Sequence, residues 1–231
     1  MTLHNNVDSK KLWWNRCTEL TNNTYINLGD RSAQIINRHI KNGIFYVRNF
    51  LSLDECDYLI KNSKERISNS TVVDPSTGYF VTDSGRISQG TYFERGASPV
   101  VTTIEQRLAR LSGLPELNGE GLQILYYKVN GEYRPHYDYF DPAISGSALQ
   151  LEQGGQRIVT IIMYLNNVEN GGGTIFPELD LEFLPEKGAA LMFSSITREG
   201  ALQPQSLHGG SPVTSGVKWI ATRWIRENFY I

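Results

Sequence analysis

The sequence predicts an α+β fold in which helices precede a β-rich sandwich or jelly-roll barrel. The first half of the chain holds segments with helical apolar spacing and capping residues. The second half holds short segments rich in β-branched and aromatic residues, and Gly-rich turns separate them. With 231 residues, 40% of them hydrophobic, the chain can bury one large core. The helices are therefore expected to pack on one face of the β-structure.

The N-terminal part is predicted to be a helical extension, residues 1–42, ahead of a main domain, residues 43–231. Its clearest segment, "DRSAQIINRHIKNG", begins at a candidate cap, Asp30, and ends at Gly43. Glycine often follows the last residue of a helix. The two parts are expected to form a single domain overall.

Two further helices are predicted before the β-rich half. In "SLDECDYLIKNSKERI", Ser52 and Glu55 have the spacing of a capping box. In "SPVVTTIEQRLARLSG", Ser98 is the candidate cap, Pro99 takes the first helical position and Gly113 ends the segment. Both segments carry an apolar stripe, which predicts that they pack against a core.

Extended segments are predicted over most of the remaining chain. Residues 71–93 read as short strands with turns at "DPSTG" and "DSG". The strands predicted in the second half are "GLQILYYKVN", "QRIVTIIMYLNNV", "GAALMFSS" and "GVKWIATRWIRE". Their separation by glycine-containing turns is typical of sandwiches and jelly rolls.

Composition excludes several function classes. The net charge of −2 does not favour nucleic-acid binding, and no apolar run reaches the length of a membrane span. The N-terminus lacks the basic-then-apolar order of a signal peptide. Cys17 and Cys56 match no zinc or redox spacing, so both are predicted to be free thiols in a reducing cytoplasm, with a single disulfide as the alternative.

The histidines raise the question of a metal site. In "GEYRPHYDYF", His136 and Asp138 lie on the same face of an extended segment. Of the other histidines, His4 is terminal and His39 falls on an early helical pattern, which leaves His208 as a partner. Two imidazoles and one carboxylate form the facial triad of non-haem Fe(II) oxygenases, which leaves open positions for a co-substrate and dioxygen. A catalytic zinc site and ordinary surface chemistry remain alternatives.

The last predicted strand adds a second clue. Strand alternation places four side chains on one face: Lys218, Ile220, Thr222 and Trp224. An unpaired ammonium that points into a barrel is costly, so Lys218 needs an anion, such as the carboxylate of a small molecule. The alternative is a lysine that reaches solvent from the start of the strand.

Several ordered motifs together resemble the prolyl 4-hydroxylase family of Fe(II)- and 2-oxoglutarate-dependent dioxygenases, in particular bacterial and viral members and the collagen-prolyl-hydroxylase-like catalytic domain. They are "LQILYYKVNGEYRPHYDYF", "GGQRIVTIIMYLNNVENGGGTIFP", "PEKGAALMF" and "SLHGGSPVTSGVKWIATRWI", and the match runs from about residue 45 to residue 227. The resemblance implies a double-stranded β-helix (jelly-roll) core with supporting N-terminal helices. It also implies His136, Asp138 and His208 as iron ligands, and residues 43–231 as the catalytic domain.

The resemblance extends to the residues around the metal. It implies that Lys218 pairs with the distal carboxylate of 2-oxoglutarate, helped by the hydroxyl groups of Tyr127 and Thr174. The substrate-facing residues of the family are similar to Tyr133, Arg157, Trp224, Ser88 and Tyr92, the last two in the closing loop "RISQGTYF". Each of these also has a plain structural interpretation, for example a core aromatic for Tyr127 or a surface charge for Arg157.

One position departs from the family pattern. The family commonly has "GGET" where this chain has "GGGT", so that Gly173 replaces a glutamate and is expected to make the turn more flexible.

The function implied by the resemblance is hydroxylation of prolyl residues in peptides or proteins, with release of succinate and CO2. The cofactors implied are Fe(II), 2-oxoglutarate and O2, with ascorbate as an auxiliary one. The alternatives are the same chemistry on a free amino acid or another side chain, a non-catalytic jelly-roll binding domain, and zinc-dependent hydrolysis. The expected partner is a proline-containing peptide or protein, with no nucleic acid and no membrane, and the chain is expected to be a monomer or homodimer.

Overall fold

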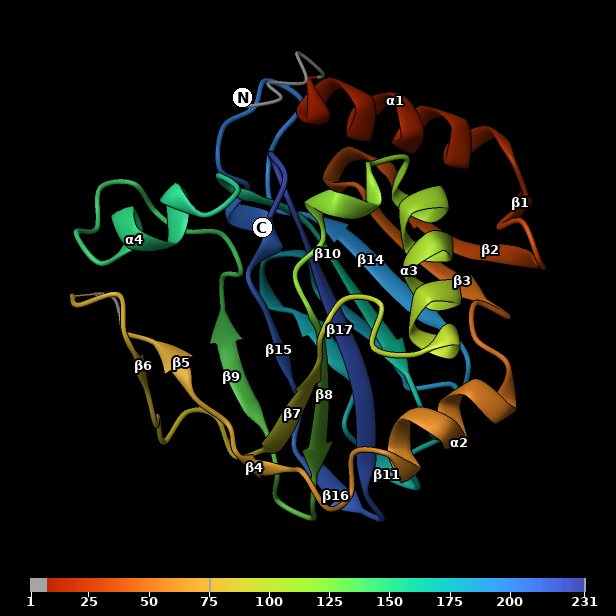
Figure 1. Ribbon diagram of the computed structural model, residues 1–231, viewed down its shortest axis with the longest axis vertical. Coiled ribbons are helices and arrows are strands. Elements are labelled where there is room, and N and C mark those ends of the chain that lie inside the picture. Colours follow the sequence, from red (N-terminus) through yellow and green to blue (C-terminus); the bar gives the residue numbers. More distant parts are fainter. Residues whose placement is uncertain (1–7, 75, 231) are drawn as a thin grey trace.

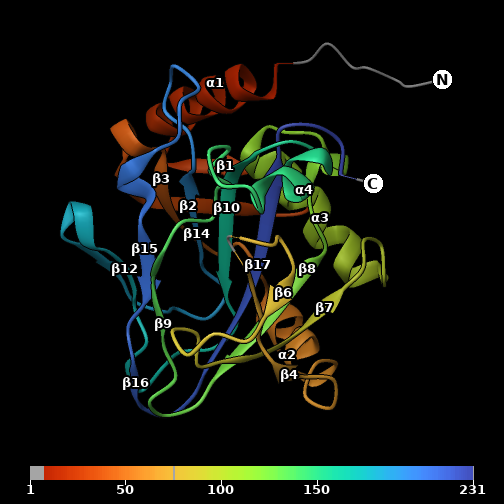
Figure 2. The ribbon, with the colours of Figure 1, turned by 90° about the vertical axis from the view of Figure 1, so that its left-hand side faces the viewer.

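The computed structural model describes residues 8–74 and 76–230, so that His4 lies outside the described residues. A large sheet forms the centre of the molecule, with α1, α2 and α3 on one side and a smaller sheet and the short helix α4 on the other (Figures 1 and 2). The helices are α1 (Ser9–Asn22), α2 (Leu53–Lys61), α3 (Pro99–Ser112) and α4 (Ser147–Glu152). Short 3₁₀ turns occupy Ile40–Asn42, Glu116–Asn118, Pro177–Leu179 and Pro204–Ser206.

The nine-stranded sheet has the order β1-β2-β3-β14-β10-β17-β8-β7-β4, and its neighbouring strands are antiparallel. Its strands are β1 (Tyr25–Asn27), β2 (Ser32–His39), β3 (Ile44–Arg48), β14 (Ala190–Ser194), β10 (Arg157–Tyr164), β17 (Lys218–Arg226), β8 (Leu122–Tyr127), β7 (Gln89–Phe93) and β4 (Ser68–Asn69). The strands predicted in the β-rich half are therefore confirmed.

The smaller sheet has four antiparallel strands in the order β13-β12-β15-β9. They are β13 (Leu181–Phe183), β12 (Thr174–Phe176), β15 (His208–Gly210) and β9 (Tyr133–His136). Two further pairs lie outside the main sheets: β11 (Asn170–Gly171) with β16 (Val213–Ser215), and β5 (Val72–Val73) with β6 (Phe80–Val81). Among the described residues, no helix has the length and hydropathy that a membrane span requires.

Local capping explains why the predicted helices form. Ser52 and Glu55 make the reciprocal capping box at the start of α2, and Ser98 accepts from the Val101 N–H at the start of α3. Gly113 ends α3 in the left-handed conformation, with φ of 70°. Both helix starts and the end of α3 are therefore confirmed, whereas α2 ends earlier, at Lys61, than its predicted segment.

The helix predicted for residues 30–43 is wrong. Residues 32–39 form strand β2, which pairs with both β1 and β3, and the N-terminal helix is instead α1. Ala33 and Ile35 are buried at alternate positions, so a period of two lies inside a segment whose ends resemble helix caps. Pairing with β3 outweighs the weak local preference for a helix. The boundary proposed at residue 42 thus lies between two paired strands.

Two cores hold these layers together. One packs the helices on the outer face of the large sheet, through residues such as Trp13, Leu59 and Leu108. The other fills the space between the two sheets and includes Tyr164 and Phe176. Beside this inner core lies a pocket, so the two sheets present their facing side chains to a common interior.

Cys17 and Cys56 are buried in the outer core and are free thiols, as predicted. Burial raises the pKa of both thiols, to about 12 for Cys56. Each therefore behaves as an apolar core side chain and not as a reactive thiolate.

Candidate active site

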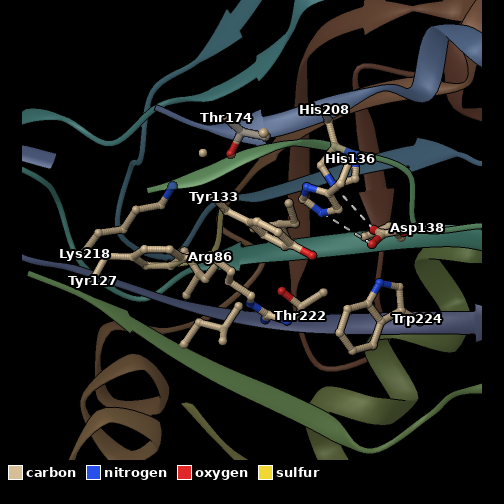
Figure 3. Close-up of a pocket in the computed structure, with 16 residues that line it drawn as sticks. Arg86, Tyr127, Tyr133, His136, Asp138, Thr174, His208, Lys218, Thr222 and Trp224 are labelled. Atoms are coloured by element: carbon tan, nitrogen blue, oxygen red, sulfur yellow. Dashed lines mark hydrogen bonds and ion pairs between the residues drawn. The ribbon is translucent and has the colours of Figure 1, made fainter. Parts of the chain in front are cut away.

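The pocket between the sheets gathers most of the residues singled out from the sequence (Figure 3). The smaller sheet supplies the histidines, because His136 ends β9 and pairs directly with His208, which begins β15. The large sheet supplies Lys218, Ile220, Thr222 and Trp224, which all line the pocket. The predicted alternation along β17 is therefore confirmed.

The side chains of His136, Asp138 and His208 converge at one end of this pocket. Their ligand atoms lie within 4.8 Å of one another. One carboxylate oxygen of Asp138 is 3.4 Å from His208 Nε2, and the other is 3.7 Å from His136 Nε2. Two imidazole nitrogens and a carboxylate at this separation form a donor set that suits a divalent metal such as Fe(II).

Hydrogen bonds behind the cluster fix the orientation of its members. Nδ1 of His136 lies 2.9 Å from the Arg134 carbonyl, and Nδ1 of His208 lies 2.9 Å from the Ser206 carbonyl. If each Nδ1–H donates to its carbonyl, each Nε2 presents a lone pair to the cluster. The Thr160 hydroxyl donates to Asp138 Oδ2 at 2.8 Å and orients the carboxylate.

The electrostatics of the cluster also favour a metal. Burial lowers the pKa of His136 to about 3, with His208 adding to the shift, so the ring is neutral. Burial raises the pKa of Asp138, but His208, His136, Arg157 and the Thr160 hydroxyl together lower it to about 2, so the carboxylate stays ionised. Neutral imidazole and carboxylate are the forms that bind a metal ion.

Lys218 lies at the other end of the pocket and is 3% exposed. Burial lowers the pKa of its ammonium to about 8, and the carboxylate of Glu182 opposes this shift. Within residues 8–74 and 76–230, Lys218 makes no ion pair, and its ammonium lies 5.3 Å from the centre of the Tyr127 ring. The pocket therefore holds a buried cation that lacks a close anion.

The hydroxyl groups predicted to assist Lys218 lie in the same pocket. Tyr127 pairs with Lys218 across β8 and β17, and Thr174 lies at the start of β12. Burial raises the pKa of Tyr127, while the positive charge of Arg86 and, to a smaller extent, the Ser88 side chain oppose the rise. Both hydroxyls are therefore neutral donors beside the cation.

The predicted substrate-facing residues divide into two groups. Tyr133 and Trp224 line the pocket, and the Tyr133 ring stacks on His136 with centroids 3.6 Å apart. Arg157, Ser88 and Tyr92 do not line it. Arg157 instead lies over the Trp224 ring at 4.0 Å and donates two hydrogen bonds to Glu120.

Ser88 and Tyr92 lie on the segment that borders the pocket. The Ser88 hydroxyl donates to Ser70 at 2.9 Å, and the Tyr92 hydroxyl accepts from Gln123. Tyr92 is 48% exposed. Gln123 connects Tyr92 to Arg86, which lines the pocket, and the Ser88 side chain is near enough to the pocket residue Tyr127 to lower its pKa.

Arg86 was not predicted as a site residue, yet it lines the pocket and its guanidinium lies 4.7 Å from the centre of the Tyr133 ring. Its guanidinium donates to the Thr71 carbonyl and to Gln123, and its buried Nε has no partner within the described residues. Arg86 is the first residue of the segment "RISQGTYF", so its position in the predicted closing loop could be seen in the sequence. A lone arginine in a loop carries no pattern that shows which way it points.

Gly173 does not leave an empty space. A Cβ built at Gly173 would collide with the carboxylate of Glu182, a residue of the neighbouring strand β13. The Ser211 hydroxyl donates to this carboxylate at 3.1 Å, and the Ser211 N–H donates to the Gly173 carbonyl. The Glu182 carboxylate therefore occupies the space beside position 173, where the family commonly has a glutamate. The hydrogen bonds from Ser211 restrict the motion of this turn.

Glu120 holds two arginines together behind the pocket, and its replacement by alanine is expected to destabilise the fold. Burial raises the pKa of Glu120, but Arg157 and Arg226 lower it more, so the carboxylate is ionised. Loss of this carboxylate leaves two largely buried guanidinium groups without their partner. We expect the free energy of unfolding, measured with urea, to fall by about 3–5 kcal/mol.

Glu186→Ala is the matched control, because it removes one exposed ion pair, with Arg48. Its cost is expected to stay below about 1 kcal/mol. Equal losses in the two variants would contradict the prediction.

Comparisons with known proteins agree with this geometry. Residues 122–226 match a family described as the 2OG-Fe(II) oxygenase superfamily. "Probable prolyl 4-hydroxylase 3" of Arabidopsis thaliana is 40% identical over 205 residues, which cover 80% of this chain and 70% of the relative. "Prolyl 4-hydroxylase 5" of the same plant is 39% identical over 215 residues, which cover 85% of this chain and 72% of the relative.

Solved structures show the same architecture. The viral collagen prolyl hydroxylase of Paramecium Bursaria Chlorella virus-1, solved as a 2OG complex, is 30% identical with a TM-score of 0.62, and the match covers 79% of this chain and 95% of that chain. A Pseudomonas putida prolyl-4-hydroxylase has a TM-score of 0.55 at 18% identity, covering 80% of this chain and 92% of that chain, which speaks for the fold alone. The predicted jelly-roll core with supporting helices is thereby confirmed.

Proposed function

Because the chain belongs to the prolyl 4-hydroxylase family of 2OG-Fe(II) oxygenases, we propose that it hydroxylates prolyl residues in peptides or proteins. The chain is a 2-oxoglutarate-dependent dioxygenase that uses Fe(II), 2-oxoglutarate and O2. When bound, these groups supply the oxidising power that places one oxygen atom on a C–H bond, with succinate and CO2 as co-products. The protein supplies binding, orientation and a pocket from which water is excluded.

The observation that carries this proposal is the pairing of two features in one pocket. The His136, Asp138 and His208 cluster lies at one end, and the buried, unpaired ammonium of Lys218 lies at the other. A five-carbon dicarboxylate such as 2-oxoglutarate fits both features, since one end chelates a metal and the other end pairs with the Lys218 ammonium. A zinc hydrolase would give Lys218 no comparable task.

The three ligand residues are proposed to hold the iron. The carbonyls behind the two histidines keep each Nε2 free to coordinate, and Thr160 keeps the Asp138 carboxylate turned toward the metal. Partners of this kind typically change metal affinity or activity 10–100-fold when they are removed. The chain thus contributes both the ligands and the groups that aim them.

Lys218 is proposed to select the co-substrate by its length. A dicarboxylate reaches the ammonium, whereas pyruvate would leave it unpaired in its buried position. Tyr127 and Thr174 add neutral donors for the same carboxylate.

The prolyl ring is proposed to pack between aromatic faces near the metal. Tyr133 and Trp224 offer such faces in the pocket, and Arg157 lies directly against Trp224. The indole N–H of Trp224 is buried and has no acceptor within the described residues, and Figure 3 shows its nitrogen on the side of the ring toward Asp138. A backbone carbonyl of a bound peptide would satisfy this donor. Ser88 and Tyr92 then belong to the segment that closes over the peptide.

The test is a side-by-side assay of proline-rich peptides and free amino acids, with products read by mass spectrometry. We expect a gain of one oxygen on proline within peptides, because Arg86 lines the pocket and the closing segment that it begins has little to hold on a lone amino acid. A gain of oxygen on free proline or another free amino acid, and on no peptide, would contradict the peptide proposal. Absence of 2-oxoglutarate turnover with every substrate would favour a non-catalytic binding domain instead.

A reducing compartment such as the cytoplasm is part of the same proposal, supported by the two buried free thiols. A monomer or homodimer is likewise proposed.

A further inference from the structure

A hydrogen bond behind the pocket links Tyr164 to Thr174. The Tyr164 hydroxyl and Thr174 Oγ1 are 2.9 Å apart, and this distance alone allows either atom to donate the hydrogen bond. Tyr164 is 0% exposed and ends β10 in the large sheet, whereas Thr174 is 3% exposed and begins β12 in the smaller sheet. Thr174 lines the pocket and Tyr164 does not. The bond therefore connects the pocket wall to a fully enclosed side chain.

The surroundings decide which hydroxyl donates. Within residues 8–74 and 76–230, neither hydroxyl has a second hydrogen-bond partner. If Thr174 donated, the Tyr164 O–H would be left with no acceptor in a place that water does not reach, which is costly. If Tyr164 donates, the Thr174 O–H is free to turn toward the pocket. Burial raises the pKa of Tyr164, so its proton stays in place.

Thr174 lies close to the cation at this end of the pocket. It pairs with Gly210 across β12 and β15, and a Cβ built at Gly210 would lie 3.6 Å from Lys218 Nζ. Figure 3 shows the Thr174 hydroxyl and the Lys218 amine at the same end of the pocket, away from Asp138. An anion paired with Lys218 is thus within reach of a proton on Thr174.

We propose that Tyr164 is a positioning residue for the distal carboxylate of 2-oxoglutarate. It donates to Thr174, and this bond commits Thr174 to donate its own proton to the carboxylate, which is an acceptor only. Two hydroxyls in series also strengthen each other. This inference rests on the proposed role of Lys218 as the carboxylate partner, and it adds a residue that never touches the co-substrate.

The variant Tyr164→Phe tests the inference by binding. Protein loaded with Mn(II) in place of iron is titrated with 2-oxoglutarate in a calorimeter, so no turnover is needed. We expect the dissociation constant for 2-oxoglutarate to rise roughly 3- to 10-fold, the effect of one weakened hydrogen bond to a charged group. A 2-oxo acid without the distal carboxylate, 2-oxobutyrate, should bind wild type and variant equally, because it does not reach Thr174.

Tyr46→Phe is the matched control. Tyr46 packs beside Tyr164 with ring centroids 5.9 Å apart, and its hydroxyl donates to the Leu184 carbonyl and not toward the pocket. Its loss removes one buried tyrosine hydroxyl from the same core, so it should leave the 2-oxoglutarate dissociation constant unchanged. In the Thr174→Val background, Tyr164→Phe should add no further loss, since the two residues act as one unit.

The outcomes separate this inference from the proposed function. Wild-type protein that binds no 2-oxoglutarate would overturn both. Wild-type protein that binds it, with Tyr164→Phe unchanged, would overturn the inference alone. So would an equal loss for 2-oxoglutarate and 2-oxobutyrate, because that result would indicate a general disturbance of the fold.

Discussion

Replacement of Asp138 by alanine is expected to abolish 2-oxoglutarate turnover. The carboxylate is the only charged member of the cluster, and it lies 3.4 Å from His208 Nε2 and 3.7 Å from His136 Nε2. Loss of a partner behind a metal ligand already costs 10–100-fold, so loss of the ligand itself should cost more than about 100-fold in succinate formation. Asp138→Asn should also be poor, because it keeps the shape but loses the charge that balances the metal. His136→Ala is expected to behave like Asp138→Ala.

The measurement combines succinate formation with bound metal, counted after equilibration with Fe(II) under anaerobic conditions. Circular dichroism checks that the fold remains. Asp141→Ala is a suitable control, because Asp141 lies three residues beyond Asp138 and outside the cluster. Its carboxylate accepts a hydrogen bond from the Ala143 N–H. Full activity in Asp138→Ala would show that the cluster is not the metal site, whatever happens to the metal count.

The elements that the sequence predicts well are those with local causes. The capping box of α2 and the cap and terminal glycine of α3 involve residues at most three positions from the helix, so the chain segment alone specifies them. The prediction for residues 30–43 was wrong because the pairing of β2 with β3 is a tertiary property. The segment has residues typical of helix ends, yet it forms a strand. Its alternate buried positions, Ala33 and Ile35, were the available signal.

In the candidate site, too, the residues predicted from the sequence are those whose placement has a local cause. Lys218 was found because strand alternation is local, and it placed this lysine on a face with Trp224. Glu120 and Tyr164 were not found, because their partners lie in other strands. Glu120 meets Arg226 at a separation of 106 residues, and Tyr164 meets Thr174 across two sheets. No spacing in the sequence encodes such pairs, so only the fold reveals them.

Lys218→Met is expected to abolish tight 2-oxoglutarate binding while it stabilises the free protein. Removal of the ammonium strands the distal carboxylate of the co-substrate, and loss of one partner of a buried pair costs on the order of 3–5 kcal/mol. That is a rise of more than about a hundredfold in the dissociation constant. Lys218→Ala should lose as much affinity, and Lys218→Arg should also be impaired, because the planar guanidinium has a different shape.

The expected gain in stability follows from the pKa. Burial lowers the pKa of Lys218 from 10.5 to about 8, so the fold favours the neutral amine. The stability from this group is fully present above pH 10.5 and is lost as the pH falls through about 8. At pH 7 the buried charge should cost on the order of 3 kcal/mol relative to a neutral side chain. Urea unfolding of Lys218→Met should therefore show higher stability than wild type at pH 7 and a smaller advantage above pH 9.

The same shift predicts how co-substrate binding depends on pH. The carboxylate of 2-oxoglutarate pairs with the charged ammonium, so wild-type affinity should be high near pH 7 and should fall as the pH rises through about 8. Titrations of Mn(II)-loaded protein from pH 6.5 to roughly pH 9.5 would measure this, and Lys218→Met should show no such fall across that range, because it has no proton to lose at this position. Wild-type affinity that stays constant across the range, or a Lys218→Met variant that binds 2-oxoglutarate like wild type, would mean that another residue anchors the distal carboxylate. Because the free enzyme gives up stability to keep this ammonium buried and unpaired, a variant that is both more stable and unable to bind would identify Lys218 as a residue kept for function.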